Sequence, residues 1–430
     1  MGDPPAYSLF DDDDDPATQV DQSFWKTPDI PAYPALARFG RFEILGRIGR
    51  GGMAEIYLAR ERADDGTVRH VVVKRLLRDM QDNQQLLGMF LEEGATATRL
   101  YHPNVCHVYE CGEIEGVTFM ALEWVFGRAL SDIIERATAR GIVIPWPVGV
   151  QLIAEIAAAL QYVHHAKGVT GRALNIVHRD VSPHNVMVSW DGQVKLLDFG
   201  IAKTGGKDDG GTKGKYAYMS PEQARSQPVD HRSDLFALGI CLYEVLAGRP
   251  LYERGTLLDT LSAIVREPPP SIVEARPDLP PALDRILARA LAKDPSQRFQ
   301  SAGEMQAALQ QVLRTQGQVV TGQRLALFLG GLFDLKEKLP MPPNHAQVTG
   351  SFAPIDGVDQ PVVQEITFER FVQHDDDAAL TPGPAPTPIV SPAIRTRSSA
   401  GRNVALWIAV VAGMVLFASL GVAAALHLLR

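Results

Sequence analysis

Cysteine is scarce in this sequence, since its 430 residues contain only Cys106, Cys111 and Cys241. Three cysteines at this spacing fit neither a disulfide framework nor a zinc cluster, so we expect reduced thiols in a cytosolic fold. The sequence also lacks a basic excess. Its net charge is −8, which argues against nucleic acid as the main partner. No basic region followed by an apolar one opens the chain, so we expect no signal peptide.

Charged side chains are absent from residues 404–429, and that run is predominantly apolar. A membrane-spanning helix needs about 20 such residues, so we predict a single-pass transmembrane helix here. Arg395, Arg397 and Arg402 precede the run, and the positive-inside tendency then places the bulk of the chain on the cytoplasmic side of the inner membrane. A buried helix of a soluble domain is the alternative.

Composition divides the rest of the chain into four segments. Residues 1–40 are acidic and interrupted by proline, and residues 340–403 are rich in Pro, Ala, Asp and Thr, so we expect a disordered tail and a disordered linker. Residues 41–315 have dense apolar periodicity and form the main domain. Residues 316–339 form a helical extension, in which a helix packed on the main domain is favoured over a partner-binding helix. The residues at helical spacing there are Leu325, Phe328, Leu329 and Leu332.

A glycine cluster lies between two alternating apolar runs in residues 41–61, which predicts a strand, a Gly-rich turn and a second strand. The pattern G-x-G-x-x-G falls on Gly49, Gly51 and Ala54, so alanine replaces the third glycine. Glycine lets backbone N–H groups approach a phosphate closely, and alanine keeps the turn small. This motif alone is weak, because many hairpins contain three glycines.

Further motifs follow in a fixed order. Residues 70–76 form a β-branched run that contains Lys74, and residues 89–105 form a helical segment that contains Glu93. Residues 178–185 read HRDVSPHN and residues 194–200 read VKLLDFG. In this order and spacing, the motifs resemble a bacterial, eukaryotic-type (Hanks-type) serine/threonine protein kinase over about residues 42–310. The resemblance implies an α+β fold with two lobes, a β-rich N-lobe and a helical C-lobe, with ATP between them.

The resemblance also implies a role for each catalytic residue. Lys74 binds the α- and β-phosphates and pairs with Glu93, while Asp180 accepts the proton of the substrate hydroxyl. Asn185 and Asp198 hold Mg²⁺, with Mn²⁺ as an alternative ion. Positioning and charge neutralisation then provide most of the catalysis.

Nucleotide contacts are implied in three places. Backbone N–H groups of the Gly-rich turn cover the phosphates. The segment LEWV acts as the hinge between the lobes, with Leu122 as gatekeeper and the backbones of Glu123 and Val125 facing adenine. Apolar side chains enclose the purine. The residues concerned are Ile48, Gly49, Arg50, Gly51, Gly52, Met53, Ala54, Glu55, Ile56, Val72, Lys74, Leu122, Glu123, Val125 and Met187.

Motifs of the helical lobe continue the resemblance. It implies an ion pair between Glu222 and Arg298 and a supporting role for Asp234 under the catalytic loop. Arg179 often pairs, in this family, with a phosphorylated residue of the activation segment. Thr204 and Thr212 are therefore candidate phosphorylation sites.

Two positions depart from the family pattern. Ser182 stands where these kinases usually have lysine, and Lys215 stands where they usually have threonine. We hypothesise that the Lys215 ammonium takes over the missing charge beside Ser182, near Asp180 and the γ-phosphate. The alternative is that Lys215 faces solvent or selects acidic substrates.

The sequence therefore predicts a membrane-anchored serine/threonine kinase that phosphorylates protein substrates and itself. A catalytically weak, kinase-like scaffold that binds nucleotide and partners is the alternative, since Ser182 and Ala54 depart from the pattern. Tyrosine specificity is less favoured, because Pro183 fits the serine/threonine pattern better. Small-residue pairs in the apolar tail, Ala409/Gly413 and Gly421/Ala425, leave a homodimer open.

Overall fold

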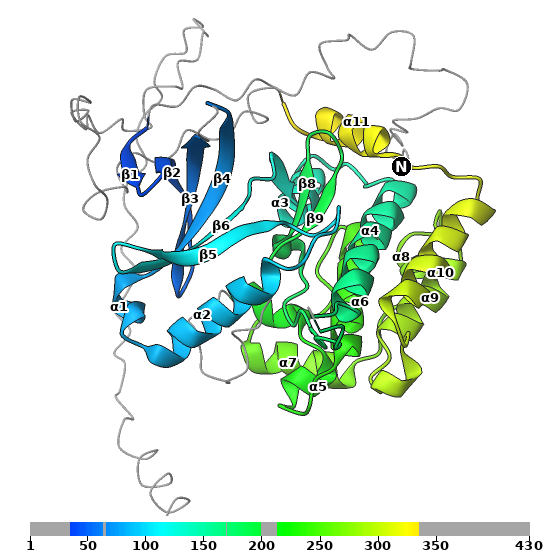
Figure 1. Cartoon of the computed structure of the whole chain (residues 1–430). Helices are drawn as coiled ribbons and strands as arrows, with labels where there is room; N and C mark the ends of the chain where they lie inside the picture. Colours follow the sequence, from blue (N-terminus) through cyan, green and yellow to red (C-terminus); the bar gives the residue numbers. More distant parts are fainter. Residues whose placement is uncertain (1–34, 63–65, 169, 199–212, 335–430) are drawn as a thin grey trace, which may run out of the picture. The chain divides into compact units, whose positions relative to one another are not determined.

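The computed structural model describes residues 35–62, 66–168, 170–198 and 213–334 (Figure 1). Most of the predicted N-terminal tail, the linker 340–403 and the predicted transmembrane run 404–429 lie outside the described residues, as do Thr204 and Thr212. All described residues belong to one unit, in which strands dominate as far as Glu123 and helices dominate after Ala129.

An antiparallel sheet builds the N-lobe, with strand order β1-β2-β3-β4-β6-β5. Its strands are rich in β-branched and aromatic residues, which pack well on a pleated surface. One face buries an apolar cluster that includes Phe42, Val71, Val73 and Phe119. The bounds are β1 Ala37–Phe39, β2 Phe42–Arg50, β3 Ala54–Arg62, β4 Val68–Leu76, β5 Val108–Ile114 and β6 Val117–Glu123.

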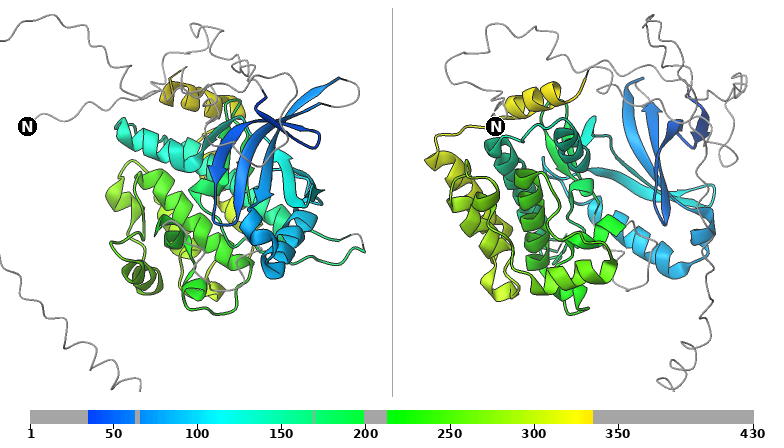
Figure 2. Two further views of the ribbon diagram at one scale, coloured as in Figure 1. Left: turned by 90° about the vertical axis from the view of Figure 1, so that its left-hand side faces the viewer. Right: turned by 180° about the vertical axis from the view of Figure 1, so that it is seen from behind.

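Two helices, α1 Arg78–Gln81 and α2 Gln84–Ala97, connect β4 to β5. The Asn83 side chain caps α2 by accepting hydrogen bonds from the N–H groups of Gln85 and Leu86. Gly94 lets α2 lie directly on β5, because a Cβ atom there would come within 2.4 Å of the Cys111 sulfur. Figure 2 shows α2 against the sheet. This close approach positions the neighbouring Glu93.

The C-lobe is helical apart from a small sheet of β7 Gly127–Ala129, β8 Val186–Ser189 and β9 Val194–Leu196. Helices α4 and α6 are apolar on most sides and form its centre, which is why most of their residues are buried. Its helices are α3 Leu130–Ala139, α4 Trp146–His164, α5 Pro221–Ala224, α6 His231–Ala247, α7 Leu257–Arg266, α8 Ile272–Ala275, α9 Ala282–Ala290, α10 Ala302–Thr315 and α11 Gly322–Leu332. The two-lobed α+β fold predicted from the sequence is confirmed.

Helix α4 is also the described helix that is long and apolar enough to cross a membrane. It is a core helix, since 67% of its apolar window is buried and α6 and α10 pack against it. Helix α11 falls in the predicted extension and buries the four apolar residues that the sequence places at helical spacing, Leu325, Phe328, Leu329 and Leu332. It contacts α3.

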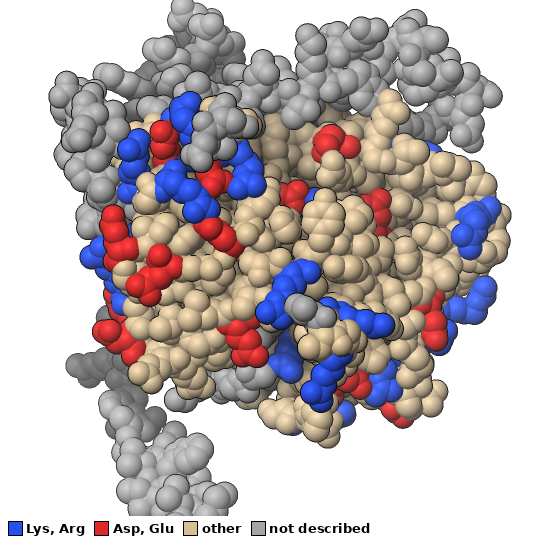
Figure 3. Space-filling view, in the orientation of Figure 1, with Lys and Arg blue, Asp and Glu red and all other residues tan. Residues whose placement is uncertain are grey.

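Charges on the outer face of the N-lobe are paired rather than segregated. Arg41 and Arg69 both contact Glu61, and Arg60 lies 2.6 Å from Glu43. Figure 3 shows the resulting mixture of basic and acidic side chains over this lobe. Pairs made by an exposed arginine, as Arg41 and Arg69 are, contribute little stability, about 0–1 kcal/mol each.

Candidate active site

Lys74 is the centre of a charge cluster between the lobes. Successive side chains of a strand alternate between its faces, so Lys74 shares a face of β4 with Val72, opposite the buried Val71 and Val73. Its Nζ lies 3.0 Å from Glu93 Oε1 and 3.2 Å from Asp198 Oδ2. Three residues predicted to act together, from β4, α2 and the segment after β9, therefore meet.

Electrostatics keep the Lys74 ammonium charged. Burial alone would lower the pKa of Lys74, but the carboxylates of Asp198 and Glu93 outweigh that effect and raise it. A buried ammonium held between two carboxylates is an anion-binding group whose position is set on both sides.

Asp180 and Asn185 form a second cluster on the catalytic loop. Asn185 Nδ2 donates to the backbone oxygen of Asp180 at 2.8 Å and to Asp180 Oδ2 at 2.9 Å. The short 3-10 turn Pro183–Asn185 brings the two residues together. Leu197 N–H donates to the Asn185 carbonyl at 2.8 Å, which links this cluster to the segment that ends at Asp198.

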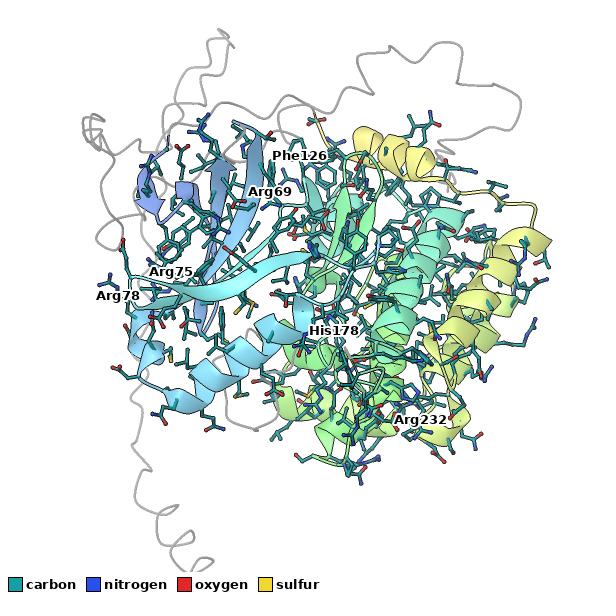
Figure 4. All side chains as sticks on the ribbon, viewed as in Figure 1. Arg69, Arg75, Arg78, Phe126, His178 and Arg232 are labelled. Carbon is teal, nitrogen blue, oxygen red and sulfur yellow. The ribbon has the colours of Figure 1, made fainter. Side chains whose placement is uncertain are left out.

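His178 and Asp234 support the loop from below. Asp234 Oδ2 accepts the His178 N–H at 2.8 Å, and Asp234 Oδ1 accepts the Arg179 N–H at 2.7 Å. His178 Nε2 lies 2.9 Å from the Leu197 carbonyl, and its Nδ1 accepts the Asp180 N–H at 3.3 Å. Figure 4 places His178 where the two lobes meet. The supporting role predicted for Asp234 is thus visible in the contacts.

Arg179 has a left-handed backbone with φ = 64°, which is uncommon for a residue other than glycine. Such a conformation is strained by roughly 1–2 kcal/mol. The Arg179 N–H donates to the Asp234 carboxylate, and the Arg179 carbonyl accepts from Gln223 Nε2 at 3.2 Å. Hydrogen bonds on both sides of the residue therefore hold this conformation. This strained residue comes directly before Asp180, whose carboxylate accepts from Asn185 Nδ2.

The predicted purine pocket follows from strand register. Ile56 pairs with Lys74 across β3 and β4, and Val72 pairs with Leu122 across β4 and β6. Strand pairing thus brings Ile56, Val72 and Leu122 close together, and their role around a purine stays a prediction. Ile48, on β2 just before the Gly-rich turn, is 49% exposed. Met187 lies on β8 opposite Ala129.

The Gly-rich turn joins β2 and β3, and Gly51 N–H donates to the Ala54 carbonyl at 2.8 Å. Arg50, Gly51 and Gly52 are exposed, whereas Ala54 is buried. The Glu55 side chain points to other partners: it accepts from Arg47 at 2.9 Å, Arg75 at 3.1 Å and Tyr57 at 2.8 Å.

The hinge contains contacts that sequence reasoning missed. The Glu123 carboxylate lies 2.9 Å from Lys195 Nζ of β9 and accepts the His107 N–H at 3.1 Å. His164 likewise binds Asp234 Oδ2 through Nε2 at 2.8 Å. The sequence offered one sign of the contact between Glu123 and Lys195, because Lys195 lies inside the short apolar strand β9 and is buried there.

The predicted pair of Glu222 and Arg298 is confirmed. Arg298 Nη1 and Nη2 each donate to one Glu222 oxygen at 2.7 Å, a bidentate arrangement in the interior. Ser182 is 1% exposed, and its Oγ has no hydrogen-bond partner among the described residues. The backbone of Lys215 lies in the 3-10 turn Lys213–Tyr218, and its side chain lies outside the described part of the chain.

Comparison with known proteins agrees with this geometry. Relatives include the tyrosine-protein kinase MasK of Myxococcus xanthus, 37% identical over 70% of this chain and 47% of the relative. They also include the serine/threonine-protein kinase pkn3 of the same species, 34% identical over 67% of this chain and 52% of the relative. Serine/threonine-protein kinase PrkC of Bacillus subtilis is 33% identical over 62% of this chain and 40% of its own length. The chain thus spans about half the length of the two Myxococcus relatives.

Among solved structures, the kinase domain of Mycobacterium tuberculosis PknI is similar, with a TM-score of 0.50 and 28% identity. The match covers 66% of this chain and 100% of that domain. The protein kinase domain family matches residues 42–313, which include Lys74, Asp180, Asn185 and Asp198. This chain belongs to the protein kinase domain family.

Proposed function

We propose that this chain is an ATP-dependent serine/threonine protein kinase that phosphorylates protein hydroxyls and itself. The observation that carries the proposal is the Lys74 cluster, in which one ammonium lies within 3.2 Å of both Glu93 and Asp198. Phosphoryl transfer needs its groups in place before reaction, and this contact joins the two lobes in the arrangement that the reaction uses. The names of pkn3 and PrkC also favour serine/threonine specificity.

The chain's own residues then divide the work. Lys74 binds the α- and β-phosphates, and Asp180 orients the acceptor hydroxyl and accepts its proton. Asn185 holds the Asp180 carboxylate through its amide N–H at 2.9 Å, so the loop keeps its shape as the substrate arrives. Backbone N–H groups of residues 49–54 cover the phosphates, and Ile56, Val72, Leu122 and Met187 enclose the purine.

The residues present fit a magnesium ion. Asn185 uses its amide nitrogen on Asp180, which leaves its oxygen free to face a cation. Asp198 is 38% exposed and directs one oxygen at Lys74, leaving the other for the same ion. Oxygen ligands of this kind suit Mg²⁺, with Mn²⁺ as an alternative, and such an ion neutralises charge on the phosphates.

The test uses the full chain with labelled ATP and Mg²⁺. Asp180→Asn and Lys74→Met should abolish phosphate incorporation while circular dichroism stays as in wild type, and Glu304→Gln, an exposed carboxylate, serves as the control. Wild-type turnover in Asp180→Asn would refute the assignment of the base. Absence of transfer in the wild type, with nucleotide still bound, would favour the scaffold alternative.

Tyrosine phosphorylation is the second candidate, because MasK is named a tyrosine-protein kinase and Ser182 replaces the lysine typical of serine/threonine kinases. Pro183 argues for the first candidate. Phosphoamino acid analysis of the labelled protein separates the two. Label on serine or threonine alone would exclude the second candidate.

We also propose that the Lys215 ammonium compensates for Ser182. What supports this is the small, buried Ser182, whose Oγ has no partner among the described residues, together with the reciprocal departure at position 215. Residues 404–429 are proposed to anchor the kinase in the cytoplasmic membrane, facing the cytoplasm, because they carry no charge and arginines precede them. A homodimer through this helix is a further proposal.

A further inference from the structure

A chain of aromatic side chains runs from the hinge to the end of α11. Trp124 and Phe126 lie 5.1 Å apart, Phe126 and Trp190 lie 6.4 Å apart, and Trp190 and Phe333 lie 5.6 Å apart between ring centroids. Phe126, labelled in Figure 4, lies in the middle of this chain of rings. Pairs at these distances contribute about 0.5–1.5 kcal/mol each beyond the apolar area that they bury. Residues distant in the sequence are therefore packed together behind the hinge.

Backbone hydrogen bonds tie this aromatic chain to the nucleotide pocket. Trp190 N–H donates to the Phe126 carbonyl at 3.0 Å, and β7 pairs with β8 so that Ala129 lies opposite Met187. The strand that leaves the hinge and the strand that carries Met187 therefore move as one unit. Displacement of Trp190 would displace the floor of the purine pocket.

Helix α11 docks on this unit without an intervening side chain. Gly192, in the turn between β8 and β9, has φ = +81°, and a Cβ atom there would lie 1.8 Å from the Gly322 carbonyl oxygen. Only glycine, which has no Cβ atom, allows the two backbones to come this close. Burial of Leu325, Phe328 and Leu329 then holds the rest of α11 in place.

Two arginines contact the end of this segment, around Phe333 and Asp334. The Arg128 guanidinium lies 5.8 Å from the rings of both Trp190 and Phe333. Arg140 Nη2 lies 2.9 Å from Asp334, but that carboxylate is 69% exposed, so the pair contributes little. Ring packing around Phe333 is the stronger attachment.

We propose that residues 322–334 position the hinge for nucleotide binding, with Phe333 and Trp190 as positioning residues that touch neither ATP nor substrate. This role rests on the proposed kinase function. A hinge that is held in its binding geometry binds ATP without first being ordered. If loosening the segment leaves only about one fifth of the molecules with the hinge in its ATP-binding geometry, the apparent Kd for ATP rises about fivefold.

The experiment compares full-length variants for binding of a non-hydrolysable ATP analogue by calorimetry. Phe333→Ala and Gly192→Ala should each raise Kd and the KM for ATP about fivefold or more, while kcat at saturating ATP stays within about twofold of wild type. Trp190→Ala removes the ring that lies between Phe126 and Phe333, so it should raise the Kd in the same way.

Gly116→Ala is the matched control for Gly192→Ala. Gly116 also has a left-handed φ, +74°, but a Cβ atom there would meet nothing within 4 Å. Both variants have the same backbone strain, and only Gly192→Ala displaces α11. A raised Kd in both would trace the effect to strain, not to α11, and would overturn the proposal.

Linkage supplies an independent measurement. If α11 favours ATP binding, then ATP must favour docked α11, so the analogue should slow amide hydrogen exchange in residues 322–332 of the wild type. Unchanged exchange, or variants that bind as wild type does, would refute the role of this segment alone. If the wild type itself failed to bind the analogue, the proposed function would fail and this role with it.

Discussion

Asp234→Asn is expected to uncouple the catalytic loop from the C-lobe. The Asp234 carboxylate is 1% exposed and accepts three hydrogen bonds, from the N–H groups of His178 and Arg179 and from His164 Nε2. Asparagine has the same shape but only one acceptor atom, so its amide NH₂ must face a buried donor. At least one backbone N–H then loses its partner inside the protein.

The magnitude follows from these contacts. An unsatisfied buried donor costs about 1–3 kcal/mol, and hydrogen bonds to a charged acceptor contribute about 1.5–3 kcal/mol. We therefore expect the free energy of unfolding to fall by about 2–4 kcal/mol. Without its acceptor, the strained Arg179 backbone relaxes and carries Asp180 with it. A displacement near 1 Å can reduce kcat about 100-fold.

Urea unfolding followed by circular dichroism gives the stability, and kcat is measured at saturating ATP below the unfolding transition. Asp230→Asn is the matched control, because Asp230 caps the same helix, is 46% exposed, and asparagine caps equally well. It should change stability by less than about 1 kcal/mol and leave kcat unchanged. Wild-type kcat in Asp234→Asn, with a stability loss below about 1 kcal/mol, would refute the reasoning.

Three further outcomes are expected. Arg298→Leu should lower the free energy of unfolding by about 3–5 kcal/mol at pH 7, because it leaves Glu222 buried without its partner. Burial by itself would raise the pKa of Glu222, but Arg298 outweighs that effect and lowers the pKa below its unfolded value. The stabilisation is therefore present above about pH 4.5 and is lost as pH falls through the folded pKa. In urea titrations, the difference in free energy of unfolding between wild type and Arg298→Leu should become smaller as pH falls. A difference that grows would contradict this. Lys215→Thr should reduce kcat about 100-fold, and adding Ser182→Lys should restore much of it, whereas additive losses would exclude an exchange. Removal of residues 403–430 should move the kinase from the membrane fraction to the soluble fraction with kcat unchanged, and cleavage of the kinase domain by protease outside intact spheroplasts would contradict the topology.

Short motifs carried most of what the sequence could predict. The sequence singled out Lys74, Asp180, Asn185 and Asp198 because each lies in a contiguous stretch whose residue types the chemistry requires. The α+β architecture followed from the family resemblance that these motifs carry, and the helix at 322–332 followed from apolar periodicity, which is a local property. Both kinds of signal are read within a few residues, so no tertiary information was needed.

Contacts between distant residues were decided by the tertiary structure. His164 and Asp234 are 70 positions apart, Glu123 and Lys195 are 72 apart, and no local pattern marks them as partners. The contact of Gly192 with Gly322 leaves no trace in composition, since many glycines occur in turns. Which buried polar groups meet depends on how helices and sheets pack, because a buried charge or N–H must find its partner from whichever element lies nearest.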